Sequence, residues 1–132
     1  MLAAQESAFE WLFEALRTAS AEQSESGAKL RAAVAVTLRF TADRPEEARL
    51  LLVETIGSDR ELALRALDYH QRFASLMRSE CEGTEGPGPG LTEQALVGAA
   101  ASLIGTCVAT ERLDELPDLE QPLVEFLQLP YA

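Results

Sequence analysis

The hydrophobic pattern of the chain centres on one stretch without a charged residue, from Gln94 to Thr110. A helix of this composition must be covered by other protein over most of its surface. On a helical wheel its larger apolar residues fall into two neighbouring sectors, and small residues form the third. The third sector consists of Ala95, Gly98, Ser102, Gly105 and Ala109. We therefore expect this helix to pack against its own domain with two sectors and against a symmetry mate with the third.

Apolar residues at helical spacing predict four helices before this stretch. The first covers residues 2–22, and the second covers about residues 28–41. Pro45 suits a first helical position, so it predicts a third helix over about residues 46–56. The sequence from Ser58 to Glu61 matches a capping box, and it predicts the start of a fourth helix that continues to about Cys81.

The Gly- and Pro-rich residues 82–90 predict a flexible loop. After the uncharged helix, residues 111–118 predict a polar connection. Pro122 is tolerated only in a first turn, so the last helix should begin near residues 118–121 and end before Pro130. A chain of 132 residues suits one domain, and we expect residues 1–132 to form a single all-α domain of six helices.

The charge of the chain is strongly acidic, with a formal net charge of −11. Lys and Arg residues form no cluster, so this chain alone should bind nucleic acid poorly. The acidity is typical of a solvated surface. It is also compatible with a field that attracts cationic ligands.

The cysteines and the N-terminus favour a cytoplasmic protein. Cys81 and Cys107 form neither a C-x-x-C unit nor a disulfide framework, which indicates a reducing compartment. The first residues lack the basic and apolar regions of a signal peptide. The uncharged helix is at the short limit for spanning and rich in Ala and Gly, so we expect no membrane role.

Two stretches carry a family resemblance: Phe40 to Glu54, and Leu116 to Tyr131. They contain a helix ending in Phe, a break with Pro, a Leu-rich helix flanked by Arg and Glu, and a final Leu-rich helix. Together with the long helices between them, they resemble the C-terminal effector-binding and dimerisation domain of TetR/AcrR-type transcriptional regulators. All six predicted helices have counterparts there in the same order.

The resemblance implies a six-helix antiparallel bundle that forms a homodimer. In the family, the last two helices of each subunit build a four-helix bundle across a two-fold axis. Residues 1–22 correspond to the helix that links this domain to a helix-turn-helix domain. That DNA-binding domain has no counterpart here, so DNA would be bound only through a domain absent from this chain.

The expected function is ligand sensing and dimerisation in a TetR-type regulator, of the repressor kind, that responds to a small and largely apolar effector. The alternative is a stand-alone helical homodimer that mediates protein contacts without binding DNA. The resemblance places the ligand cavity among the first five helices but transfers no single pocket residue.

A small-molecule cavity needs aromatic and aliphatic walls and a few polar groups. For each aromatic residue the alternative is ordinary core packing. For Glu54 the alternative is an ion pair with Arg49 or Arg65. The candidates for the pocket are Trp11, Thr37, Phe40, Glu54, Tyr69, His70, Phe73, Met77, Leu103 and Cys107.

The dimer interface should combine the small-residue sector of the uncharged helix with the apolar seam of the last helix. That seam consists of Leu119, Leu123, Phe126 and Leu127. We expect Leu103 and Cys107 to face the ligand, and Gly98 and Gly105 to face the mate.

The sequence offers no pattern of a metal site or of catalysis. His70 is the only histidine, and Leu67 stands where a Glu-x-x-His unit would need its carboxylate. No nucleophile elbow or phosphate-binding loop is present. We therefore expect neither a cofactor nor an enzymatic activity.

Overall fold

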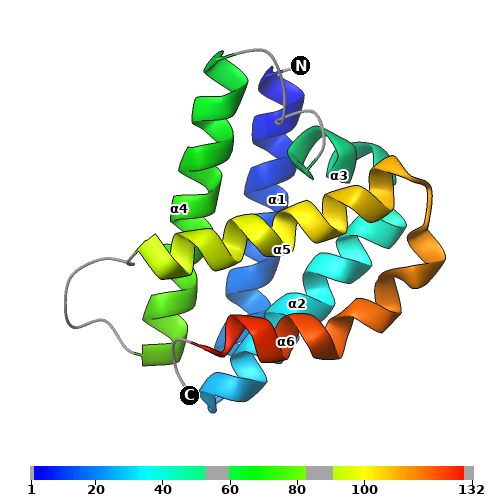
Figure 1. The fold of residues 1–132 in the computed structure, drawn as a ribbon. Coiled ribbons are helices and arrows are strands. Elements are labelled where there is room, and N and C mark those ends of the chain that lie inside the picture. Colours follow the sequence, from blue (N-terminus) through cyan, green and yellow to red (C-terminus); the bar gives the residue numbers. More distant parts are fainter. Residues whose placement is uncertain (1, 53–59, 83–90, 130–132) are drawn as a thin grey trace.

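The computed structural model describes residues 2–52, 60–82 and 91–129, and in these ranges it contains helices and no strand. This confirms the all-α prediction. The elements, shown in Figure 1, are α1 (Leu2–Ala21), α2 (Ser26–Asp43), α3 (Pro45–Leu52), α4 (Arg60–Glu82), α5 (Leu91–Ala109), the 3-10 helix η1 (Leu113–Leu119) and α6 (Glu120–Leu127).

The helix boundaries follow from local signals in the sequence. α3 begins at Pro45, with Glu46 and Glu47 in its first turn and Arg49 in its last, an arrangement that complements the helix dipole. The expected end of this helix, the capping box, and the expected loop beyond Glu82 lie outside the described residues.

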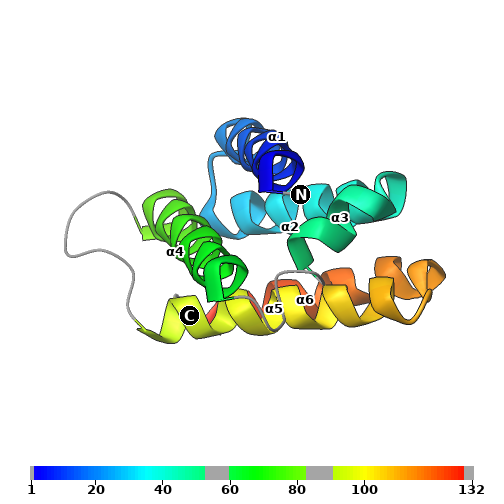
Figure 2. The same cartoon turned by 90° about the horizontal axis from the view of Figure 1, so that it is seen from above.

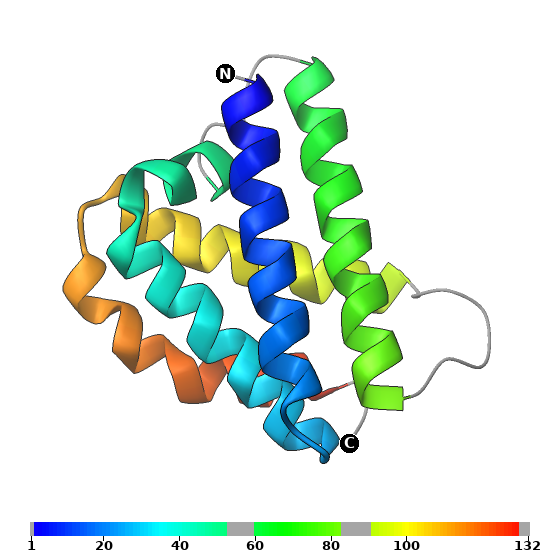
Figure 3. The same ribbon diagram turned by 180° about the vertical axis from the view of Figure 1, so that it is seen from behind.

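The helices form layers, as Figure 2 shows. α5 and α6 lie together on one side, α1 lies on the opposite side, and α2, α3 and α4 lie between them. α1 and α4 run side by side, which Figure 3 shows from behind. Among the described helices, α2 contacts every other one and so forms the centre of the fold.

Two hydrophobic clusters fill the interior. The first is formed by α2, α5, η1 and α6, and its members include Leu30, Val34, Ile104, Leu116 and Leu123. The second lies mainly between α1, α2, α3 and α4, and its members include Phe9, Leu12, Phe40, Leu51 and Tyr69. Leu52 and Leu113 pack against both clusters. Each fully buried side chain of this kind stabilises the fold by about 1.5–3 kcal/mol.

The short helix α3 joins α1 to α5 through contacts of its backbone and of one arginine. Gln5 Nε2 on α1 donates a hydrogen bond to the carbonyl oxygen of Leu50 at 3.0 Å. Arg49 Nη2 donates to the carbonyl oxygen of Val108 on α5 at 3.2 Å. A Cβ atom at Gly105 would lie only 2.7 Å from the carbonyl oxygen of Leu52, so the missing side chain permits this contact.

A buried ion pair fixes the beginning of α5 against the end of α4. The Glu93 side chain is only 2% exposed, and Arg78 Nε donates a hydrogen bond to its Oε1 atom at 2.9 Å. A second nitrogen of the same guanidinium also contacts this oxygen. A buried carboxylate is costly without such a partner, so the pair determines where α5 starts on α4.

The segment predicted as a polar connection is partly a 3-10 helix, η1. Leu113, Leu116 and Leu119 recur at intervals of three residues, which is the period of a 3-10 helix. Leu116 is buried in the first cluster, and the other two pack against that cluster. The three-residue spacing was the signal that the prediction missed.

The orientation of α5 differs from the prediction. The glycines expected to face a mate lie inside: Gly105 is buried against Leu52, and Gly98 lies near His70. Leu103, expected to face the ligand, is 51% exposed on the outer side. A wheel on which every sector is uncharged shows which residues share a side but not which side faces inward.

In the described part of the chain, one segment, Thr92–Ala109, is long and apolar enough to cross a membrane by length and composition alone. Core helices of soluble proteins meet the same criterion. One side of α5 packs against α2, α3, α4, η1 and α6.

The contact at Gly105 predicts a difference between two glycine substitutions on α5. Gly105→Ala should destabilise the protein by about 1–3 kcal/mol, because the new methyl group would overlap the Leu52 carbonyl. Gly98→Ala is the matched control, since its Cβ would meet His70 Nδ1 at an ordinary 3.6 Å. There the better helix propensity of Ala should stabilise the protein by up to ~1 kcal/mol.

Urea denaturation of both variants measures the difference. Equal effects of the two substitutions on the free energy of unfolding would contradict the close packing of α3 on α5.

Candidate functional site: an apolar cavity in the core

A cavity of about 130 Å³ lies between α1, α2, α4, α5 and α6. Its wall is mostly aliphatic and includes Leu12, Leu30, Val34, Leu76, Val97, Ala100, Ala101, Ile104 and Leu123. The end of α3 also reaches it through Leu52. The cavity therefore touches five of the six α-helices directly and the remaining one through its last residue.

Few polar side chains line this cavity. Among the described residues of the wall they are Ser20, Lys29 and Thr37. The Thr37 hydroxyl donates a hydrogen bond to the carbonyl oxygen of Ala33, one turn earlier, at 2.9 Å. Ser20 is 3% exposed and Lys29 is half-buried. The described wall thus contains one cation and no carboxylate.

The volume limits what the cavity can hold. A dry apolar cavity of about 150 Å³ in another protein binds benzene or xenon, whereas sites for drug-sized ligands begin at about 300 Å³. Without movement of its walls, the cavity accommodates an apolar group of roughly the size of benzene.

Three of the predicted pocket residues line the cavity: Thr37, Phe73 and Met77. Two others lie outside the cavity wall, where the Trp11 ring stacks on the ring of Phe40 from the second cluster at a centroid distance of 5.3 Å. Trp11 is 45% exposed, and the Arg44 guanidinium lies 4.3 Å from its ring centroid. Trp11 is therefore held by a cation-π contact rather than by the cavity.

The remaining pocket candidates lie elsewhere. Tyr69 is buried in the second cluster, where it stacks on Phe9 at a centroid distance of 4.1 Å. Cys107 is a buried free thiol of the first cluster but does not line the cavity. Leu103 lies on the outer side of α5, and Glu54 lies outside the described residues.

The Tyr69 hydroxyl is buried and has no hydrogen-bond partner among the residues that the structure describes. An interaction with Tyr69 raises the pKa of Arg65, one turn earlier, although no contact between the two side chains meets hydrogen-bond geometry. An unsatisfied buried hydroxyl of this kind costs about 1–3 kcal/mol.

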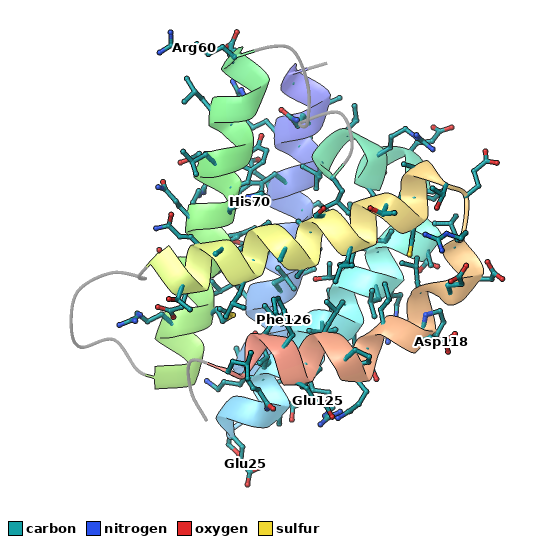
Figure 4. The ribbon with its side chains drawn as sticks, viewed as in Figure 1. Glu25, Arg60, His70, Asp118, Glu125 and Phe126 are labelled. Atoms are coloured by element: carbon teal, nitrogen blue, oxygen red, sulfur yellow. The ribbon has the colours of Figure 1, made fainter. Side chains whose placement is uncertain are left out.

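His70 lies where α5 crosses α4, as Figure 4 shows. Burial lowers the pKa of His70, because the charged imidazolium loses hydration there. The side chain is therefore neutral at pH 7 and packs beside Gly98. It does not line the cavity.

The basic partners suggested for Glu54 have other contacts. Arg49 donates to the carbonyl oxygen of Val108, and Arg65 lies 3.9 Å from a carboxylate oxygen of Glu6. Glu54 itself lies outside the described residues.

Sequence reasoning missed most of the aliphatic wall. Leu30, Val34 and Leu38 follow one another at four-residue spacing on α2, and the first two of them line the cavity. The missed cation, Lys29, precedes Leu30 at the start of the same helix. A pattern of apolar residues indicates burial, but a void depends on how several helices meet.

The residues predicted for a dimer interface are divided between two environments. Ala95, Ser102 and Ala109 are exposed on the outer side of α5. Leu123 and Leu127 are buried and line the cavity instead. Leu119 and Phe126 are half-buried against the first cluster, and Figure 4 shows Phe126 between α6 and α5.

Among the described residues, no group of three or more His, Cys, Asp or Glu side chains could hold a metal ion. The mostly aliphatic wall of the cavity suits an apolar molecule, which it could bind by shape and burial.

No family, no curated protein and no solved structure matches the chain. The cavity and the uncharged, exposed side of α5 are the features on which a function can be argued.

Proposed function

We propose that this chain is the ligand-sensing and dimerisation domain of a TetR-type transcriptional regulator, of the repressor kind, that responds to a small and largely apolar molecule. The observation that carries the proposal is the cavity of about 130 Å³ in the core. Its mostly aliphatic wall would be removed further from water by a small apolar ligand, and this burial would favour binding.

The position of the cavity supports a sensing role. Leu12 and Leu16 of α1 line it, and α1 is the helix that would link the domain to DNA-binding heads. Leu52 of α3 also lines it, and the neighbouring Leu50 carbonyl holds Gln5 of α1. A ligand that fits better with one position of α1 would shift the population towards that position.

The outer side of α5 supports a homodimer. Its exposed residues carry no charge, and they are Thr92, Ala95, Ala99, Ser102, Leu103, Thr106, Ala109 and Thr110. Figure 2 shows no other helix beyond α5 and α6 on this side. A two-fold axis there would bring α5 and α6 of two subunits into a four-helix bundle.

A second candidate function is a stand-alone helical homodimer that mediates protein contacts without DNA binding. The same uncharged side of α5 favours it. This alternative gives no role to the cavity, so ligand binding distinguishes the two functions.

A cavity-filling substitution tests the ligand site. In Ala101→Leu the larger side chain would occupy the cavity, whereas Ala42→Leu places the same change at an exposed position near the end of α2. A panel of benzene, toluene and 1-hexanol should raise the melting temperature of the wild type and of Ala42→Leu by about 5 °C at ten times Kd. Ala101→Leu should lose this shift.

The same melting curves contain a control for the cavity itself. Ala101→Leu without ligand should be as stable as the wild type, because a real void accepts the added atoms, whereas a filled core would lose about 1–3 kcal/mol. No shift with any compound, or an equal shift in Ala101→Leu, would contradict the proposed sensor.

A pair of threonine substitutions tests the dimer. Thr106 is exposed on the outer side of α5, and Thr18 is exposed on α1 in the opposite layer. Light scattering should give twice the chain mass of 14.3 kDa for the wild type and for Thr18→Arg. Thr106→Arg should be monomeric, because each subunit would bury a new charge without a partner. A dimeric Thr106→Arg would exclude this surface as the interface.

A further inference from the structure

His70, the only histidine of the chain, lies where α4 and α5 cross, as Figure 4 shows. Its half-buried ring packs against α5 at Gly98, where a Cβ atom would lie 3.6 Å from Nδ1 and 3.9 Å from Cε1. A histidine is the side chain that ordinarily changes its charge between pH 5 and 8. The crossing of two core helices thus contains a group that can titrate near neutral pH.

The same two helices build part of the cavity wall. On α4, Phe73 follows His70 by three residues and lines the cavity. On α5, Ala101 follows Gly98 by three residues and lines it as well. Residues three apart lie on the same side of a helix, so a change in the spacing of α4 and α5 at His70 would also move this part of the wall.

The surroundings of the ring suit a neutral imidazole. From Gln94 to Thr110, α5 has no charged side chain, so it offers no carboxylate at this contact. Among the described residues, His70 takes part in no hydrogen bond or ion pair. Burial lowers the pKa of His70, because a charged ring would lose hydration there without gaining a partner.

The charged groups of the helices that pack against α4 do not compensate a charge on His70. On α5, Glu93 pairs with Arg78, and on α1, Glu6 lies 3.9 Å from Arg65. On α2 and on α4 itself, none of the described charged groups contributes to the pKa of His70, for which burial is the cause. These groups include Lys29, Arg31, Arg39, Asp43, Asp68 and Arg72.

From this placement, and resting on the proposed function, we infer that protonation of His70 releases the ligand from the cavity. A charged ring favours an arrangement in which α4 and α5 move apart and water reaches the imidazolium. This movement widens the wall between Phe73 and Ala101 and removes contacts that hold an apolar molecule. The sensor therefore loses its ligand in acid.

The pH range follows from the direction of the pKa change. The pKa of His70 is lower in the folded protein than the ordinary value of 6.5. The stabilisation by the neutral ring is therefore fully present above pH 6.5 and is lost as the pH falls through the lower pKa of the folded protein. By reciprocity, a ligand that holds α4 against α5 lowers the pKa of His70 further.

The pH dependence of 1-hexanol binding tests this link. Isothermal titration calorimetry should give a Kd about threefold higher at about pH 5.5 than at about pH 7.5, within the limit of about tenfold per pH unit for one linked proton. Carboxylates with ordinary pKa values stay mostly ionised over this range.

Two variants assign the pH dependence to its source. His70→Gln has an uncharged side chain at both pH values, so it should bind 1-hexanol like the wild type at about pH 7.5 and lose the threefold difference. Asp68→Asn is the matched control, because it removes another titratable group of α4 at an exposed position. It should keep the difference.

A second measurement needs no variant. Because the chain has one histidine, the imidazole protons give one set of NMR signals, and their pH titration reports the pKa of His70. Saturating 1-hexanol should move the midpoint of this titration to lower pH.

The outcomes distinguish this inference from the proposed function. If Kd is equal at both pH values, if His70→Gln keeps the difference, or if 1-hexanol leaves the midpoint unchanged, the link to His70 is wrong and the sensor proposal stands. If 1-hexanol binds the folded wild type at neither pH, the sensor proposal itself is contradicted.

Discussion

A helix with no charged side chain over residues 94–110 cannot be surrounded by water, and most of the fold is arranged to cover one half of α5. The helices α2, α3, α4, η1 and α6 contribute contacts to it. The two glycines of α5 lie on this covered half, where Gly105 allows α3 to approach and Gly98 lies beside His70 of α4. The ion pair between Arg78 and Glu93 then fixes the first turn of α5 on α4.

This arrangement gives the two sides of α5 different roles. The inner side supplies Ala100, Ala101 and Ile104 to the cavity wall. The outer side is uncharged and exposed, and it is the surface of the proposed dimer contact. In the proposed regulator, α5 thus lies between the ligand and the second subunit. The short helix α3 connects α5 to α1, because Arg49 of α3 contacts α5 and Gln5 of α1 contacts α3.

The positions of the helices along the chain could be predicted from the sequence, but the side of each helix that faces the core could not. Pro45, the Gly- and Pro-rich segment before α5 and the apolar spacing located the helices, because these signals act through local sterics and burial. The uncharged wheel of α5 could not show which side faces inward, so Gly105 and Leu103 were placed on the wrong sides. Glu93 looked like an ordinary first-turn acid, since its partner Arg78 comes from a different helix.

The candidate site was predictable only in part for a similar reason. Thr37, Phe73 and Met77 line the cavity as expected, because they lie on apolar faces of α2 and α4. Tyr69 and Phe40 lie on similar faces but fill the second cluster. Periodicity identifies buried positions, whereas a void arises from the volumes of side chains on several helices that meet.

Met77 gives the most direct test of the central claim that the cavity is a ligand site, because the chain has only two methionines and Met77 lines the cavity. Methyl-labelled methionine would yield two NMR signals, and the variant Met77→Leu assigns one of them. Addition of 1-hexanol should shift the Met77 signal in a saturable manner and leave the other signal unchanged. An unchanged Met77 signal at saturating 1-hexanol would contradict the account.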